Sequence, residues 1–243
     1  MNGLIGLCGV VVLLLAVGGA IGLADRKRFN LRWLLAAALL VAANDALLTR
    51  GYGLLPNLLP DAQWNWQGKL LALALTLAIA ALPVIGWRRA GFTLAQHPGS
   101  LKASLPAVLL YCGFFAALAL AFPGGAATGE EIAFQLTMPG LEEELFYRGL
   151  LLFALDRAFT GRVRFLGIEW GWGAVLSCLL FGMAHAFSYS GGAFSLGGFS
   201  FDVMTMALTA MPSLLAVWLR VRTGSVLLPV LVHNFGNSIF LLL

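Results

Sequence analysis

Three consecutive carboxylates and an arginine lie in the segment GLEEELFYRGLL, residues 140–151, of a chain in which only 11% of the residues are charged. Glu144 and Arg148 are four residues apart, so on a helix their side chains share a face and can pair. Glu143 points about 100° away around that helix, and its own i+4 neighbour is Tyr147. The spacing therefore predicts two roles: Glu144 is held by Arg148, and Glu143, with no cation on its face, is free to exchange a proton.

A simpler interpretation of the same segment is a charged helix start. Carboxylates are favoured at the positive end of the helix dipole, and this accounts for Glu142. It accounts poorly for Arg148, because a cation in the second turn of a membrane helix needs a partner.

Two histidine motifs lie in apolar segments nearer the C-terminus. Phe181 and His185 are four residues apart in one, and His233 and Asn237 are four apart in the other. Taken alone, a histidine at a helix end is more often an interfacial residue than a catalyst. A buried His–Asn pair can equally be a hydrogen-bonded contact between helices. His97, the third histidine, lies in a basic loop and is expected to be solvated.

A glutamate, two histidines and an asparagine together suit hydrolysis by activated water. A desolvated carboxylate can act as a general base, and a neighbouring histidine can orient the water. A second histidine and an amide are donors suited to a developing oxyanion. The chain has no G-x-S-x-G and no H-E-x-x-H sequence. The alternative chemistry is a zinc ion held by Glu143, His185 and His233 with one open position.

The elements that position these residues are membrane helices. The chain has 243 residues, of which 60% are hydrophobic, and a mean hydropathy of +0.90. A span needs about 20 apolar residues, and the period-two alternation of a membrane barrel is absent. The sequence predicts an all-α polytopic membrane protein of about eight transmembrane helices, with the catalytic core in the last four to five. The predicted spans are 3–24, 31–48, 69–87, 103–122, 141–159, 171–187, 202–219 and 225–243.

The intramembrane polarity is concentrated in the C-terminal part of the chain. We expect residues 1–100 to form accessory transmembrane helices 1–3 with a cytoplasmic loop, and residues 101–243 to form the catalytic transmembrane core. A short helix over 129–138 is expected to end at Pro139-Gly140, too short to span. The uncharged, glycine-rich segment 188–201 is expected to be mobile.

Most of the fifteen basic residues follow the odd-numbered predicted spans. They are Arg26, Lys27, Arg28 and Arg32; Arg88, Arg89 and Lys102; Arg157, Arg162 and Arg164; and Arg220 and Arg222. By the positive-inside rule, both termini face away from the cytoplasm. This topology explains the net charge of +4 without nucleic acid as a partner. It also brings Glu143, His185 and His233 together in the outer half of the bilayer.

The three motifs resemble those of a known family. The E-E-x-x-x-R, F-x-x-x-H and H-x-x-x-N motifs that begin at Glu143, Phe181 and His233 are similar, in this order, to those of the CPBP intramembrane proteases. That family, also called the ABI family, includes the type II CAAX prenyl endopeptidases. The similarity covers about residues 100–243 and extends to the flanking YRGLL and RTGSVLLPVLVHN sequences.

The resemblance implies a glutamate-dependent intramembrane endopeptidase with an eight-helix-type fold, and we favour chemistry without a metal or other cofactor. It implies that Glu143 is the base with His185 beside it, and that His233 and Asn237 form the oxyanion site. Structural support is expected from four further side chains: Glu144, Arg148, Phe181 and Tyr147. Zinc held by the Glu143, His185 and His233 set remains the alternative to metal-free chemistry.

The expected substrate is a peptide or protein in or at the membrane, and the lipid bilayer is the other expected partner. The CAAX endopeptidases act near the cytoplasmic face, whereas the predicted topology places this site towards the outer side. An exported or membrane-anchored substrate in a prokaryotic cell membrane therefore fits better than a prenylated one. Two alternatives stay open: a non-proteolytic bacteriocin-immunity or scaffold protein of the same fold, and a proton-coupled transporter, although no pair of broken helices favours the latter.

Overall fold

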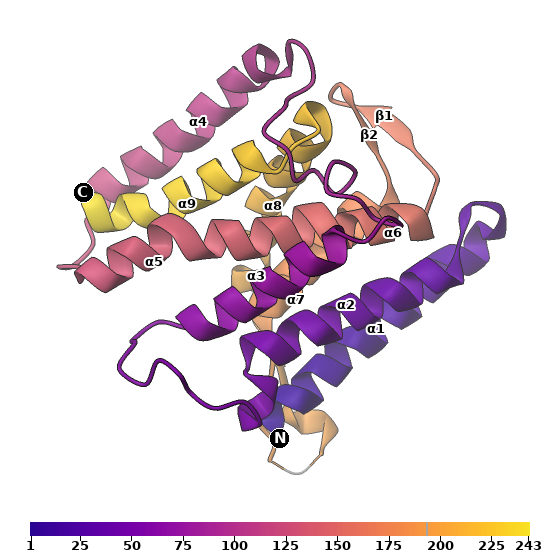
Figure 1. Cartoon of the computed structure of the whole chain (residues 1–243), viewed down its shortest axis with the longest axis horizontal. Helices are drawn as coiled ribbons and strands as arrows, with labels where there is room; N and C mark the ends of the chain where they lie inside the picture. Colours follow the sequence, from indigo (N-terminus) through magenta and orange to yellow (C-terminus); the bar gives the residue numbers. More distant parts are fainter. Residues whose placement is uncertain (193) are drawn as a thin grey trace.

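The structure, a computed structural model, describes residues 1–192 and 194–243. Its helices are α1 (Asn2–Ala24), α2 (Leu31–Leu48), α3 (Trp66–Ala80), α4 (Ser100–Ala121), α5 (Gly129–Pro139), the π-helix η3 (Gly140–Leu151), α6 (Leu152–Ala158), α7 (Trp172–Ala186), α8 (Val203–Thr223) and α9 (Leu227–Leu242). Because α5, η3 and α6 form one continuous rod, the described residues contain eight long helical segments (Figure 1). The predicted all-α polytopic membrane architecture is confirmed.

Four helices, α1, α2, α4 and α8, are long and apolar enough to cross a membrane by length and composition. The apolar helices α3, α7 and α9 have only 15, 15 and 16 residues. The span predicted at 69–87 is displaced towards the N-terminus, because α3 ends at Ala80, shortly before Pro83. Proline cannot donate to the helical ladder, and the chain continues in turns.

The helix predicted over 129–138 does not end at Pro139-Gly140. Figure 1 shows α5, η3 and α6 as a single rod that passes through the middle of the molecule. The α-helical hydrogen-bond pattern is interrupted where α5 ends at Pro139 and η3 begins at Gly140. Asn234 of α9 compensates for this interruption, because its Oδ1 accepts a hydrogen bond from the Gly140 N–H at 2.7 Å. A Cβ at Gly140 would lie 2.4 Å from that oxygen, so this close approach of α9 needs glycine.

Close helix contacts are made by small residues, as expected where lipid supplies no hydrophobic driving force between helices. The helices α1 and α2 approach closely at Gly18, where a Cβ would lie only 2.8 Å from Leu34. Leu34, Phe146 and Leu155 belong to the buried core that joins α1, α2, η3, α6 and α7. The helix α4 is peripheral: it runs beside α9 and leaves most of its surface exposed (Figure 1).

Three short 3-10 helices and two hairpins complete the chain: η1 (Arg26–Arg28), η2 (Gly51–Gly53), η4 (Leu196–Gly198), β1 (Val163–Phe165) paired with β2 (Ile168–Trp170), and β3 (Phe187–Tyr189) paired with β4 (Phe199–Phe201). The β3–β4 hairpin lies against the start of α1, where the backbone N–H of Gly192 donates to Asn2. Residue 193, inside the segment expected to be mobile, lies outside the described residues.

The basic loops gather at one end of the helical bundle. Nη2 of Arg220 donates to the carbonyl of Arg89 at 3.0 Å, and the N–H of Thr160 donates to the carbonyl of Arg28 at 2.9 Å. The fold thus places the loops after α1, α3, α6 and α8 together, as an alternating membrane topology requires. The chain is an integral membrane protein, and which face of the membrane this end occupies stays a prediction.

Candidate active site

The ion pair predicted from the four-residue spacing lies in η3. Nε of Arg148 is 3.2 Å from Oε2 of Glu144, and both side chains are 1% exposed. Nη2 of Arg148 also donates to Oγ of Ser213 on α8 at 2.7 Å. The Cζ atom of Arg148 lies 4.2 Å from the centroid of the Phe181 ring. The guanidinium is therefore held by a carboxylate, a hydroxyl and an aromatic face, which offsets the cost of burying a cation.

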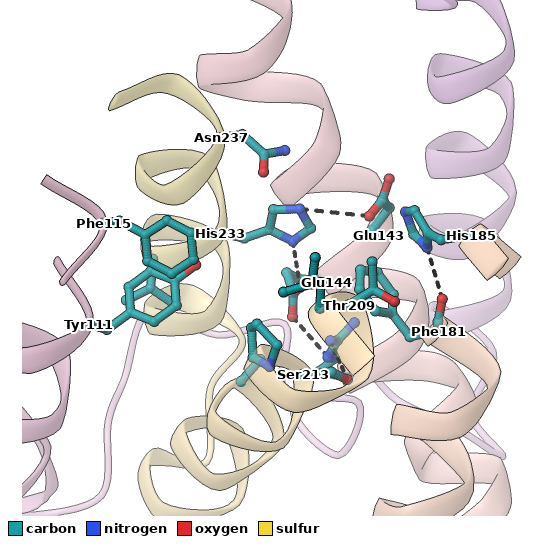
Figure 2. A pocket seen from close by; sticks show the side chains of 15 residues that line it. Tyr111, Phe115, Glu143, Glu144, Phe181, His185, Thr209, Ser213, His233 and Asn237 are labelled. Atoms are coloured by element: carbon teal, nitrogen blue, oxygen red, sulfur yellow. Dashed lines mark hydrogen bonds and ion pairs between the residues drawn. The ribbon is translucent and has the colours of Figure 1, made fainter. Parts of the chain in front are cut away.

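His233 on α9 connects the two glutamates (Figure 2). Its Nδ1 lies 2.7 Å from Oε1 of Glu144, and its Nε2 lies 3.7 Å from Oε2 of Glu143. An ionised carboxylate only accepts hydrogen bonds, so Nδ1 is the N–H donor and Nε2 of the neutral ring carries the lone pair. Glu144 therefore fixes the tautomer and the orientation of His233 in addition to pairing with Arg148.

The expectation that Glu143 has no cation partner is wrong. Nζ of Lys69 on α3 lies 2.6 Å from Oε1 of Glu143 and 2.7 Å from Oε2 of Glu142. Glu142 is completely buried, and its Oε1 accepts a 3.1 Å hydrogen bond from Nδ2 of Asn44 on α2. Glu142 is thus an interior residue rather than a solvated carboxylate at a helix start. No local pattern in the sequence indicates this contact, because Lys69 and Glu143 are 74 residues apart.

The helix α7 contributes Phe181 and His185. Nδ1 of His185 lies 2.8 Å from the carbonyl oxygen of Phe181, which can only accept, so Nε2 of the neutral ring is free for another contact. The Phe181 ring meets the rings of Tyr147 and His233 edge to face, with centroids 5.1 and 6.0 Å apart. These contacts suit the supporting role predicted for Phe181 and Tyr147.

The two asparagines of α9 have different surroundings. Asn237 is exposed, and its Nδ2 donates to Oε1 of Gln135 on α5 at 3.2 Å. Asn234 is buried; besides accepting from Gly140, it donates to the carbonyl of Thr137 at 3.3 Å. Asn234 is not among the residues that the motifs predicted, although it joins α9 to the junction of α5 and η3 and so positions His233 beside the glutamates.

The site opens into a cavity of about 340 Å³. Figure 2 shows Glu143 between His233 and His185, with Asn237 above them. The opposite wall is formed by Tyr111 and Phe115 of α4. The cavity therefore brings together all four residues predicted to be catalytic, from η3, α7 and α9.

Two buried carboxylate oxygens of the cavity receive no hydrogen bond from the described residues, and one of them, Oε2 of Glu144, is instead in an ion pair with Arg148. Oε2 of Glu143 receives no hydrogen bond from any residue that the structure describes, although Oε1 is bound by Lys69. Buried polar atoms are nearly always satisfied by protein or by water. A water molecule in the cavity beside Oε2 and His233 would thus have a defined acceptor.

The zinc alternative depends on three ligands that converge on one point. Among residues 1–192 and 194–243, no group of three or more His, Cys, Asp or Glu side chains is arranged to hold a metal ion. Both oxygens of Glu144 and one oxygen of Glu143 are committed to protein cations or to His233. Metal-free chemistry remains a prediction.

Fold and site together define a polytopic α-helical membrane protein with a buried cluster of glutamates and histidines that faces a cavity. Residues 131–239 match the family model described as "Type II CAAX prenyl endopeptidase Rce1-like". The segment that carries all three motifs is therefore related to these endopeptidases, and the resemblance inferred from the motifs is confirmed. This match supports a protease of the intramembrane type. Searches of the curated proteins and of the solved structures return no match.

Proposed function

We propose that the chain is an intramembrane endopeptidase that hydrolyses a peptide bond with a water molecule activated by glutamate and histidine. The observation that carries the proposal is the unpartnered Oε2 of Glu143, buried in the cavity 3.7 Å from Nε2 of His233. A water molecule in the cavity beside these two atoms would have Oε2 as the acceptor for its proton and the imidazole as a second contact. The related Rce1-like segment supports the same class of reaction.

The reaction would begin with attack of the water oxygen on the scissile carbonyl carbon. Oε2 of Glu143 takes one proton of the water as the C–O bond forms. The oxyanion would accept a hydrogen bond from Nε2–H of His233, whose ring Glu144 holds through Nδ1–H. This contact requires a second ring proton, which His233 would take from solvent before the attack and keep through the step. The proton held by Glu143 then passes to the amide nitrogen as the C–N bond breaks, so the products are a carboxylic acid and an amine.

His185 and Asn237 would complete the site. Nε2 of His185 remains available to orient the water, because Nδ1 is occupied by the Phe181 carbonyl. The amide of Asn237, which donates to Gln135 in the substrate-free protein, would exchange that contact for the oxyanion. These roles require no metal ion.

The cavity supports a peptide as the substrate. Its wall includes Phe115, Leu208 and Val232 beside the polar groups, so apolar side chains of a peptide would have partners next to the reacting carbonyl. We infer a substrate that is membrane-anchored or exported, because the predicted topology opens the site towards the outer half of the bilayer. The lipid bilayer is the second partner.

The test compares membrane peptides from cells that express the wild type, Glu143→Gln or Glu169→Gln. Glu169 lies on β2, is exposed and provides a matched control. Fragments present with the wild type and Glu169→Gln, and absent with Glu143→Gln, are expected. An unchanged set of fragments with a folded Glu143→Gln protein would reject the peptidase and favour the scaffold or immunity alternative. Cleavage of a farnesylated CaaX peptide by the purified protein would instead assign a prenylated substrate.

A further inference from the structure

Lys69 lies outside the segment that resembles the endopeptidases, yet it makes the shortest ion pair of the candidate site. It belongs to the first turns of α3, where Oδ1 of Asn65 caps the helix by accepting from the N–H of Gly68. The helices α2 and α3 approach closely here, since a Cβ at Gly68 would lie 2.3 Å from the carbonyl oxygen of Leu48. The position of Lys69 is thus set by the cap of α3 and by the close approach of α2 at Gly68.

The ammonium of Lys69 lies between two carboxylates. Its side chain is 12% exposed, and it binds Oε2 of Glu142 and Oε1 of Glu143 at 2.7 and 2.6 Å. Nδ2 of Asn44 donates to the other oxygen of Glu142. This chain of contacts joins α2 and α3 to the carboxylate that faces the cavity.

We propose that Lys69 is a positioning residue of the active site. By binding Oε1 of Glu143, it turns Oε2 towards His233 and the water, and Glu142 with Asn44 keeps the lysine in place. The helices α2 and α3 then complete the site instead of only flanking it. This inference rests on the proposed peptidase function, since a positioned base has meaning only if Glu143 takes a proton.

A purely structural role for Lys69 makes a different prediction. A buried glutamate such as Glu142 needs a counter-charge, and Lys69 could serve that purpose alone. In that case, replacing Lys69 and Glu142 together by neutral residues would leave the reaction intact. If Lys69 positions Glu143, the same double replacement preserves the net charge of the site but frees Oε1, and the rate falls.

The experiment uses the Glu143-dependent fragments in the membrane peptides of cells, quantified per folded protein. The variants are Lys69→Met/Glu142→Gln, Lys69→Arg and Lys102→Met; the last is a matched control at an exposed lysine of α4. We expect the double variant to fold, as judged by thermal unfolding in detergent, and to form fragments about 10- to 100-fold more slowly, the range that a misplaced catalytic group produces. Lys69→Arg should recover part of that loss, since it keeps the charge.

The outcomes separate this inference from the proposed function. Fragments formed at the wild-type rate by the double variant, but lost with Glu143→Gln, would overturn the role of Lys69 and leave the peptidase assignment intact. If the double variant fails to fold, Lys69→Arg decides. A stable Lys69→Arg protein that forms fragments more slowly than the wild type would support positioning, because the charge alone would not suffice, and a stable one at the wild-type rate would overturn it. The absence of any Glu143-dependent fragment would overturn both proposals.

Discussion

Replacement of Arg148 by methionine should destabilise the protein by about 3 kcal/mol. The substitution keeps a long apolar side chain and removes the cation, so Glu144, which is 1% exposed, is left charged in the interior. Removing one partner of a buried ion pair typically costs about 3–5 kcal/mol. We expect the lower end of that range, because Nδ1 of His233 still donates to Oε1 of Glu144 at 2.7 Å.

A second arginine of the same rod provides the control. Arg157 of α6 is exposed, and its Cζ lies 5.2 Å from the centroid of the Phe153 ring. Arg157→Met therefore removes an arginine and an aromatic contact without stranding a buried carboxylate, and an exposed contact of this kind is worth about 0.5–1 kcal/mol. The difference between the two variants, about 2 kcal/mol, measures the stranded charge.

The measurement is unfolding of the purified protein in mixed micelles with increasing dodecyl sulphate, followed by far-ultraviolet circular dichroism. The double variant Glu144→Gln/Arg148→Met should recover at least half of the loss, because it removes the uncompensated charge and keeps an acceptor for His233. An Arg148→Met protein as stable as Arg157→Met would refute the reasoning, and so would a double variant less stable than Arg148→Met.

Two further predictions concern the metal and the membrane orientation. Cleavage by the purified protein should survive prolonged treatment with a strong chelator, and elemental analysis should find well below one transition metal per chain. The reason is that both oxygens of Glu144 and Oε1 of Glu143 already have protein partners. Stoichiometric zinc, with activity lost on its removal and restored on its return, would contradict this and make Glu143, His185 and His233 the ligands. Reporter fusions should place the loop after Arg89 in the cytoplasm and the end at Leu243 outside, because the basic loops gather at one end of the bundle. A cytoplasmic C-terminus would contradict this and would remove the objection to a prenylated substrate.

The sequence could predict those contacts that depend on helical periodicity. Glu144 and Arg148 pair because they are four residues apart on one rod, and Phe181 reaches His185 for the same reason. The helical architecture was equally accessible, since long apolar segments in a lipid environment have few alternatives to helices. Sequence spacing therefore reaches as far as the contacts within one helix.

Contacts between helices that are distant in sequence were not accessible in this way. Lys69 is the first residue of the predicted span 69–87, and nothing local in the sequence connects it with Glu142 and Glu143. Pro139 indicated a helix end, because proline usually interrupts the ladder. The structure continues the helix because Asn234, on another helix, satisfies the Gly140 N–H. In both cases the contact is made by a residue of another helix, Lys69 of α3 or Asn234 of α9, and the sequence does not specify which helices are neighbours.

The three consecutive glutamates of η3 now have a physical explanation. Consecutive residues on a helix point roughly 100° apart, so three of them address three different neighbours. Glu142 faces Asn44 and Lys69, Glu143 faces Lys69 and His233, and Glu144 faces His233 and Arg148. Three carboxylates thus share two permanent cations, which leaves one negative charge in excess when His233 is neutral. An uncompensated charge inside a membrane protein costs free energy, so its presence usually indicates a function. Among the described residues, Oε2 of Glu143 is the carboxylate oxygen of this group that has neither a permanent cation nor a hydrogen-bond donor. The excess negative charge is therefore available on Oε2, where a proton taken from water would neutralise it.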